Sequence, residues 1–239
     1  MKRALSLIML TLLLCAAGQP VSAQRHRYTP PAPRRPMSTG RYSSSHYYFG
    51  ENMYTNMSVG LSAAHVNSDN PLLDGGSSQT GLNVGLHLGF GITPMAPLFF
   101  ETGLEYAEKG GKGMKGDSKT TFDLNYLEVP LVLKYIAPVA PRTTIEPYLG
   151  GYLACGVGGK IKEYGSHTTY SSFGDGAFKR FDGGIRAGIG ARFDLFSVDL
   201  GYDFGLSNIG DDAFDDAHNG AFYARVGLTF EDERLKMKD

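Results

Sequence analysis

Nine charged side chains stand at alternate positions within segments that are otherwise apolar. They are Glu101, Glu105, Glu128, Lys134, Arg186, Arg192, Asp199, Asp203 and Arg225. Side chains of opposite charge that are held away from water form paired, hydrogen-bonded networks. The same residue types can line a narrow path for ions or protons. Because both signs are represented almost equally, the pattern favours a salt-bridge network that holds a structure together over an ion path.

Residues for catalysis or metal binding form no recognisable motif. His65, His87, His167 and His218 lack metal-ligand spacing, and the chain has neither an H-E-x-x-H motif nor a nucleophile elbow. A His–Ser or Asp–His pair at a loop rim is the one hydrolytic arrangement left open. We therefore predict a protein that is not an enzyme and that uses no cofactor or resident metal.

Two segments outside the apolar pattern each gather one sign of charge. The segment "GDDAFDDA" holds four carboxylates that could bind Ca²⁺, although it lacks an EF-hand pattern: Asp211, Asp212, Asp215 and Asp216. The segment "EKGGKGMKGDSK" holds four amines that could meet the acidic segment or lipopolysaccharide phosphates: Lys109, Lys112, Lys115 and Lys119. The simplest interpretation of both is a solvated surface loop.

The charged residues belong to segments with a period of two. In "GLNVGLHLGFGI" every even position from Leu82 to Ile92 is apolar, while glycine and polar residues fill the odd positions. A helix would scatter these apolar residues around its circumference, so the segment is a strand with one apolar face. The alternation recurs in seven further segments: 57–63, 100–106, 127–135, 145–157, 185–193, 198–205 and 222–230. The chain is therefore all-β with eight strands.

The connections between these strands alternate between long and short. An even strand count with this alternation is typical of an antiparallel, up-and-down transmembrane β-barrel with long extracellular loops and short periplasmic turns. The apolar face would then contact lipid, and the face of glycines and charges would fill the narrow lumen of eight strands, which leaves no open diffusion pore. A soluble lipocalin-like barrel with its apolar face inward is the alternative fold.

The segment "NYLEVPLVLKY", residues 125–135, contains two irregularities. Phe122, Leu124 and Tyr126 lie on the opposite parity from Leu127 and the apolar residues that follow it, which predicts a change of register and a β-bulge near residues 125–127. Pro130 removes one ladder hydrogen bond in the middle of the strand. Glu128 and Lys134 should face the lumen, where the arginines and Asp203 are candidate partners.

The two ends of the chain differ from the barrel segment, residues 50–230. Residues 1–23 have the basic start, apolar run and small-residue cleavage site of a signal peptide, which predicts export to the outer membrane. Residues 24–49 form a basic, Pro/Ser-rich arm that is expected to be disordered in the periplasm, and residues 231–239 form a charged tail. After cleavage only Cys155 remains, so no disulfide framework can form.

Several segments resemble the PorT-like outer-membrane β-barrel family of Bacteroidota, often labelled porin family proteins. They are "NYLEVPLVLKY", "EPYLGGYLACGVGG", "FDGGIRAGIGARF", "VDLGYDFGLSNI" and "AFYARVGLTF". The resemblance covers about residues 50–230 and implies an eight-stranded barrel with a periplasmic N-terminus. It transfers no catalytic residue.

We therefore expect a non-enzymatic, integral outer-membrane protein that acts through its surface loops or its periplasmic arm, in adhesion, ligand binding or envelope structure. A narrow channel, or an accessory subunit of an outer-membrane transport or secretion apparatus, is the alternative function. The expected partners are outer-membrane lipid, lipopolysaccharide, the barrel-assembly machinery during insertion, and a periplasmic or secretion-system protein. Binding of nucleic acid is not expected.

Overall fold

The computed structural model describes residues 53–68, 77–115, 118–174, 177–211 and 216–231. The predicted signal peptide, the predicted basic arm, residues 232–239, Asp212 and Asp215 lie outside the described residues. In the part that is described, no helix is long and apolar enough to cross a bilayer. The regular structure of this part is a single antiparallel sheet of eleven strands.

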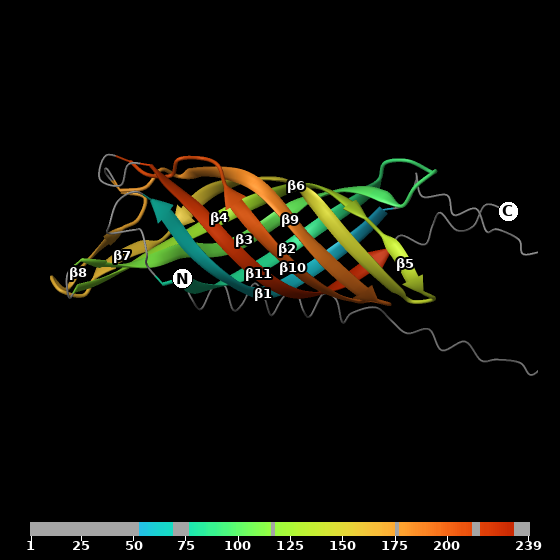
Figure 1. The fold of residues 1–239 in the computed structure, drawn as a ribbon, viewed down its shortest axis with the longest axis horizontal. Helices are drawn as coiled ribbons and strands as arrows, with labels where there is room; N and C mark the ends of the chain where they lie inside the picture. The colour runs from blue at the N-terminus through green and yellow to red at the C-terminus, as the bar shows by residue number, and fades with distance from the viewer. Residues whose placement is uncertain (1–52, 69–76, 116–117, 175–176, 212–215, 232–239) are drawn as a thin grey trace, which may run out of the picture. The chain divides into compact units, whose positions relative to one another are not determined.

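Eight long strands close into a barrel (Figure 1). They are β1 (Met53–Ser68), β2 (Gln79–Gly91), β3 (Leu98–Lys115), β4 (Ser118–Tyr135), β6 (Thr143–Gly158), β9 (Phe181–Phe193), β10 (Phe196–Gly205) and β11 (Ala217–Glu231). Each strand pairs with its neighbours along the chain, β11 returns to β1, and the pairing of β4 with β6 completes the circle. The expected eight-stranded, up-and-down barrel is confirmed.

Three short strands lie outside the circle, one at one end of the barrel and two at the other (Figure 1). At the end with short connections, here the short-turn end, β5 (Ala137–Ala140) pairs with the start of β6. At the opposite end, here the long-loop end, β7 (Lys160–Glu163) pairs with β4 and with β8 (Thr168–Ser171). The ends of β3 and β4 together with β7 and β8 form a small four-stranded sheet, which we call the extension.

The extension corrects the sequence-based assignment of residues 108–119 as a loop. β3 continues to Lys115 and β4 begins at Ser118, so this segment is a β-hairpin. The alternation of apolar residues fades there, although the strands continue, because a strand beyond the bilayer has no need for an apolar outer face. The loop assignment failed because it relied on that alternation.

The exposed fractions of the side chains separate the two faces of the barrel. Large apolar residues at alternate positions point outward; Leu61 is 59% exposed and Leu86 is 50% exposed. The intervening polar and charged residues point inward and are buried. This is opposite to a lipocalin, which packs its apolar face inside, so the alternative of a soluble lipocalin-like barrel is wrong. An outer face of this kind is stable in hydrocarbon, and closure satisfies every barrel strand's backbone groups there.

Aromatic side chains on the outer face gather at two levels. Near the short-turn end Phe90 lies opposite Phe100 in the β2–β3 pair, and Phe193 lies opposite Phe196 across the tight turn at Asp194 and Leu195. Near the other end Tyr202 lies opposite Phe222, and Tyr106 lies opposite Leu127. Aromatic girdles of this kind mark the two interfaces between bilayer and water.

An irregularity in register lies where the sequence predicted one, but on the neighbouring strand. Between Asn125 and Tyr126 of β4 the partner on β6 changes from Gly158 to Gly156, so the extra residue is Val157. β4 itself keeps its alternation. As a result Phe122, Leu124 and Tyr126 point into the barrel and are almost fully buried, whereas their apolar character had suggested a change of face.

Pro130 is accommodated at a break in one ladder. On the β6 side it lies in register with Tyr152. On the β3 side the pairing stops at Thr102 and resumes at Glu105. The interruption therefore falls opposite Pro130, which has no N–H to donate. The residue opposite it is Gly103, at which a Cβ atom would lie only 2.2 Å from the backbone oxygen of Leu86. The loss is confined to this one point of the ladder.

Substituting Leu86 tests the assignment of faces. Leu86→Arg places a charge on the lipid-facing side of β2 and should lower the free energy of unfolding in lipid vesicles by about 2–4 kcal/mol if the site is near the midplane. Met95→Arg, at a position 93% exposed in the β2–β3 connection, is the matched control and should change it by less than about 0.5 kcal/mol. Equal effects at the two positions would contradict the assignment.

Candidate functional site

The centre of the lumen is organised around Arg186 of β9, which is 1% exposed. Its Nε donates to Oδ1 of Asp203 at 2.6 Å and its Nη2 donates to Oδ2 at 2.9 Å, which makes a bidentate pair. Its Nη1 donates to Oε1 of Glu105 at 2.8 Å, and Nη2 also donates to Oε2 of Glu128 at 2.8 Å. One guanidinium therefore joins β9 to β10, β3 and β4, and the last two strands lie across the lumen from it.

Two residues that the sequence analysis had not placed in the lumen complete this cluster. Nζ of Lys109 lies 2.7 Å from Oε1 of Glu128 and 3.0 Å from Oδ2 of Asp203. Nε2 of His87 lies 2.6 Å from Oε1 of Glu105. Lys109 had been assigned to a basic loop; its parity, four residues after Glu105 and eight after Glu101, is the signal that could have placed it inside the barrel.

A second cluster lies nearer the short-turn end. Nζ of Lys134 lies 2.7 Å from Oε2 of Glu101 and 3.9 Å from Oε2 of Glu146. Nε of Arg192 lies 2.9 Å from Oε1 of Glu146, and its Nη1 lies 2.6 Å from Oε1 of Glu231. Glu231 is therefore part of β11 and of the ion network, which places the end of the barrel one residue later than the expected boundary at Phe230.

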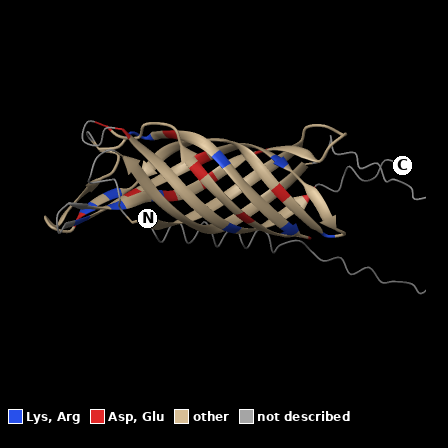
Figure 2. Cartoon of the chain, viewed as in Figure 1, with Lys and Arg blue, Asp and Glu red and all other residues tan. Residues whose placement is uncertain are grey.

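The nine charged residues singled out from the sequence all lie on the inner face and are buried. Figure 2 shows both acidic and basic positions on the strands in the middle of the barrel. Glu128 meets Arg186, as the sequence analysis anticipated, whereas Lys134 meets Glu101 and Glu146 instead of Asp203. Arg225 approaches Glu105 at 2.5 Å and Asp199 at 4.0 Å.

The sequence analysis did not identify four further luminal residues: Lys109, His87, Glu146 and Asp182. Oδ2 of Asp182 accepts a hydrogen bond from Nδ2 of Asn219 at 2.9 Å.

Tyrosine rings cover most of the luminal cations. Nζ of Lys109 lies 4.1 Å from the ring centre of Tyr152, and the guanidinium carbon of Arg225 lies 4.5 Å from that of Tyr223. Arg186 lies within 6 Å of both rings. These distances permit cation–π attraction in a site that is shielded from water. Glycines leave room for the rings: a Cβ on Gly201 would lie 2.4 Å from Cζ of Tyr223.

An apolar cluster fills the lumen toward the long-loop end. Phe122 and Leu124 of β4 meet Ile161 of β7 and, from the connections, Phe173 and Phe178, all of them buried. Phe122 packs edge-on against Phe178, and Tyr126 packs edge-on against Phe173. We call this group the apolar plug. It closes one end of the lumen above the charge network.

Of the proposed loop cation site only Asp211 and Asp216 belong to the described residues. The described part of the chain has no group of three or more His, Cys, Asp or Glu residues placed to hold a metal ion. Asp216 and His218 do form an Asp–His pair at the loop rim, with 3.3 Å between Oδ1 and Nε2. The Asp216 side chain is exposed and the His218 side chain is half-buried, so the contact is a partly solvated one of small energy.

A closed, eight-stranded barrel with an apolar outer face, aromatic girdles and a polar, filled lumen defines the class of outer-membrane barrel proteins. Comparison with protein families agrees: the family described as "Outer membrane protein beta-barrel domain" matches residues 23–211. The chain belongs to this family, and its location is the outer membrane. No curated protein matches the chain.

Among solved structures the chain resembles other outer-membrane barrels. Neisserial surface protein A is 19% identical, with 74% of this chain and 97% of that chain covered and a TM-score of 0.44. Ail of Yersinia pestis, in complex with the heparin analogue sucrose octasulfate, is 17% identical, with 75% and 99% covered and a TM-score of 0.40. OprG of Pseudomonas aeruginosa is 11% identical, with 78% and 97% covered and a TM-score of 0.43.

The role of the central arginine can be measured by comparing two arginines. Arg186→Met leaves the carboxylates of Glu105, Glu128 and Asp203 buried with less compensation, and should lower the free energy of unfolding by about 3–5 kcal/mol. Arg142→Met removes an arginine whose pair with Asp194 is 72% and 58% exposed, and should cost less than about 1 kcal/mol. Urea unfolding in lipid vesicles measures both, and an Arg186 variant as stable as the Arg142 variant would refute a structural role for the network.

Proposed function

We propose that the protein is a non-enzymatic, non-conducting barrel that serves as a rigid scaffold and acts through its long-loop end in adhesion or ligand binding at the cell surface. The single observation that carries the proposal is the filled lumen: a buried ion network is capped by the apolar plug. An interior filled in this way has a structural use, which leaves the surface as the part available for partners.

The luminal contacts oppose conduction. An ion that entered would have to displace carboxylates from Arg186, whose four donated hydrogen bonds measure 2.6–2.9 Å. It would then have to pass the plug, in which Phe122 and Ile161 are at most 1% exposed. Conduction requires sites that bind weakly enough to release the ion, and the short, charge-assisted bonds of Arg186 oppose such an exchange.

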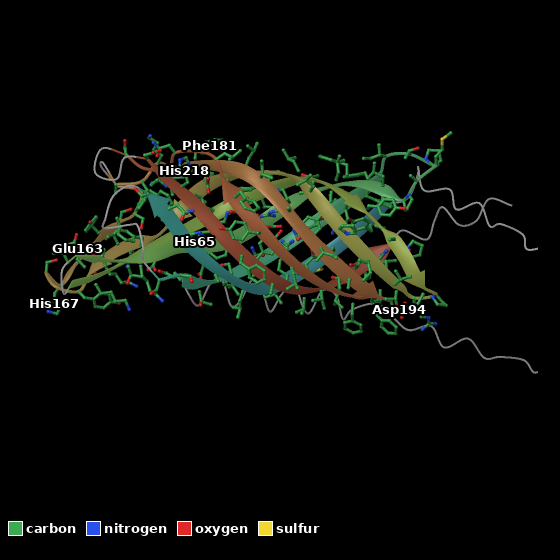
Figure 3. The ribbon with its side chains drawn as sticks, viewed as in Figure 1. His65, Glu163, His167, Phe181, Asp194 and His218 are labelled. Carbon is green, nitrogen blue, oxygen red and sulfur yellow. The ribbon has the colours of Figure 1, made fainter. Side chains whose placement is uncertain are left out.

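The extension supplies a presenting surface. Figure 3 shows Glu163 and His167 at its far end, at the opposite end of the barrel from Asp194. Tyr164 and Tyr170 are large, exposed aromatic residues on the same hairpin. Exposed tyrosines are well suited to binding because they offer a large contact area and a hydroxyl at low cost in conformational entropy.

The sequence motifs support a PorT-like member of the family, exported by a cleaved signal peptide and inserted by the barrel-assembly machinery. For such a member, an accessory role in an outer-membrane transport or secretion apparatus is the second candidate function. In that role the barrel would again act by binding a partner, in this case a periplasmic or secretion-system protein, and the filled lumen favours this over a channel of its own.

Conductance tests the filled lumen. The full chain in planar lipid bilayers should give no large, steady current in symmetric salt, because the ion network and the plug both block the path. Arg186→Met, which opens the network but leaves the plug in place, should also remain closed. A stable open channel in the unmodified protein would contradict the proposal.

The extension can be tested without disturbing the barrel. The triple variant Tyr164→Ser, His167→Ser and Tyr170→Ser changes exposed side chains only, and should reduce adherence of cells that produce the protein, on immobilised proteins and glycans, to the level of cells that lack it. The double variant Met95→Ser and Val139→Ser alters exposed residues at the short-turn end and should adhere like the unmodified protein. Full adherence by the triple variant, with normal folding on gels, would rule out this surface.

A further inference from the structure

Four lysines lie on one face of the extension. They are Lys112 of β3, Lys119 of β4, and Lys160 and Lys162 of β7. We call this set the lysine face. Two of its members come from a segment with Gly-rich surroundings and two from a segment about forty residues further on, so only the fold brings them together.

The register of the strands places these side chains on the same side. Lys112 lies opposite Thr121, and Thr121 lies opposite Lys162, so both lysines share the face of Thr121. Lys119 and Lys160 each lie two residues from a member of this row and therefore point the same way. The extra residue Val157 is what permits this arrangement, because it shifts the parity of the β6–β7 segment relative to β4.

The lysine face is the outward face of the barrel, continued beyond the bilayer. On β4 the odd positions from Leu127 to Leu133 are exposed and apolar, and Asp123, Thr121 and Lys119 follow on the same side. Leu127 lies opposite Tyr106, at the level of the aromatic girdle. The four lysines are level with positions four to eight residues above it, about 13–26 Å further along the strand. With the usual strand tilt this is roughly 10–20 Å above the girdle, at the height of lipid headgroups and their sugars.

Positive charge dominates this face. Its described acids are Glu108 and Asp123, and both have local partners. Glu108 accepts from the hydroxyl of Tyr106 and from the backbone N–H of Leu82. Asp123 accepts from Lys162 at 3.1 Å and from the side chain of Gln79, and the bond to Asp123 raises the pKa of Lys162 above its ordinary value. Lys119 lies 5.8 Å from the ring centre of Tyr164 and remains exposed.

We propose that the lysine face binds the phosphate groups of outer-leaflet glycolipid beside the barrel. Clustered amines attract phosphate, and a cluster that faces sideways at headgroup height meets membrane lipid before it meets any soluble anion. The site goes beyond the proposed surface function, because it would orient the extension on the membrane; it borders Tyr164 through Lys119 and does not include Tyr170 or His167.

Binding of a defined lipid tests the proposal. The full chain, folded in neutral detergent micelles, is titrated with fluorescent diphosphoryl lipid A. The quadruple variant Lys112→Gln, Lys119→Gln, Lys160→Gln and Lys162→Gln should raise Kd at least tenfold, since each basic residue near an anionic surface contributes about fivefold. The double variant Lys179→Gln and Arg180→Gln removes two exposed charges of the same end that lie outside the face, and should leave Kd within about twofold of the unmodified protein.

Further binding measurements distinguish lipid phosphate from other anions as the ligand. Dephosphorylated lipid A should bind the unmodified protein at least tenfold more weakly, and millimolar inorganic phosphate should fail to displace the diphosphoryl form. A quadruple Lys→Arg variant should retain binding. Equal binding of the two lipids, or displacement by inorganic phosphate, would overturn the proposal.

Single variants guard against a folding defect in the quadruple variant. Lys119→Gln and Lys160→Gln alter exposed side chains, and each should raise Kd by about fivefold. Asp123→Asn frees Lys162 from its acidic partner and should lower Kd. Unchanged Kd values in all three folded variants would equally refute binding at this face.

Discussion

Twelve charged side chains of the described residues are buried inside a closed barrel, and the rest of the structure depends on neutralising them there. Lipid cannot hydrogen-bond the backbone, so the strands must close, and eight strands enclose only enough space for side chains. Charges in that space are stabilised by one another, by neutral polar side chains and by the tyrosine rings beside them. Arg186 meets this requirement by bonding three carboxylates from three strands. Lys109 lies beside the second oxygen of Glu128, and Arg225 shares Oε1 of Glu105 with Arg186.

The division of the molecule into a rigid part and a presenting part follows from this constraint. The ion network and the apolar plug fix the strands to one another from inside, and their buried side chains occupy the lumen. The strands β3 and β4 carry that rigidity beyond the bilayer, where β7 and β8 complete a small sheet. Function is therefore expected at the surface of this sheet, on its sides and at its tip.

Most of the barrel could be predicted because a period of two is a direct consequence of strand geometry in a bilayer. Glu128 and Arg186 were assigned to the lumen for that reason alone, and the structure buries both.

The prediction failed where the bilayer ends. Lys109 has no alternating apolar neighbours in the sequence there, so it was assigned to a loop. Phe122 was predicted to require a change of face. In fact an apolar side chain at that height points inward, because the end of the lumen must be closed. Nor could the partners of Lys134 be predicted, since they depend on the stagger between strands, which the pattern of one strand does not contain.

Luminal ion pairs hold the barrel together, and a double-mutant cycle between Arg186 and Glu128 tests this role most directly. The free energy of unfolding in lipid vesicles is measured for the unmodified protein, Arg186→Met, Glu128→Gln and the double variant. Because the two side chains share a buried bond of 2.8 Å within one network, the account predicts a coupling energy of about 1–3 kcal/mol. Additive effects, with no coupling between the two positions, would contradict it.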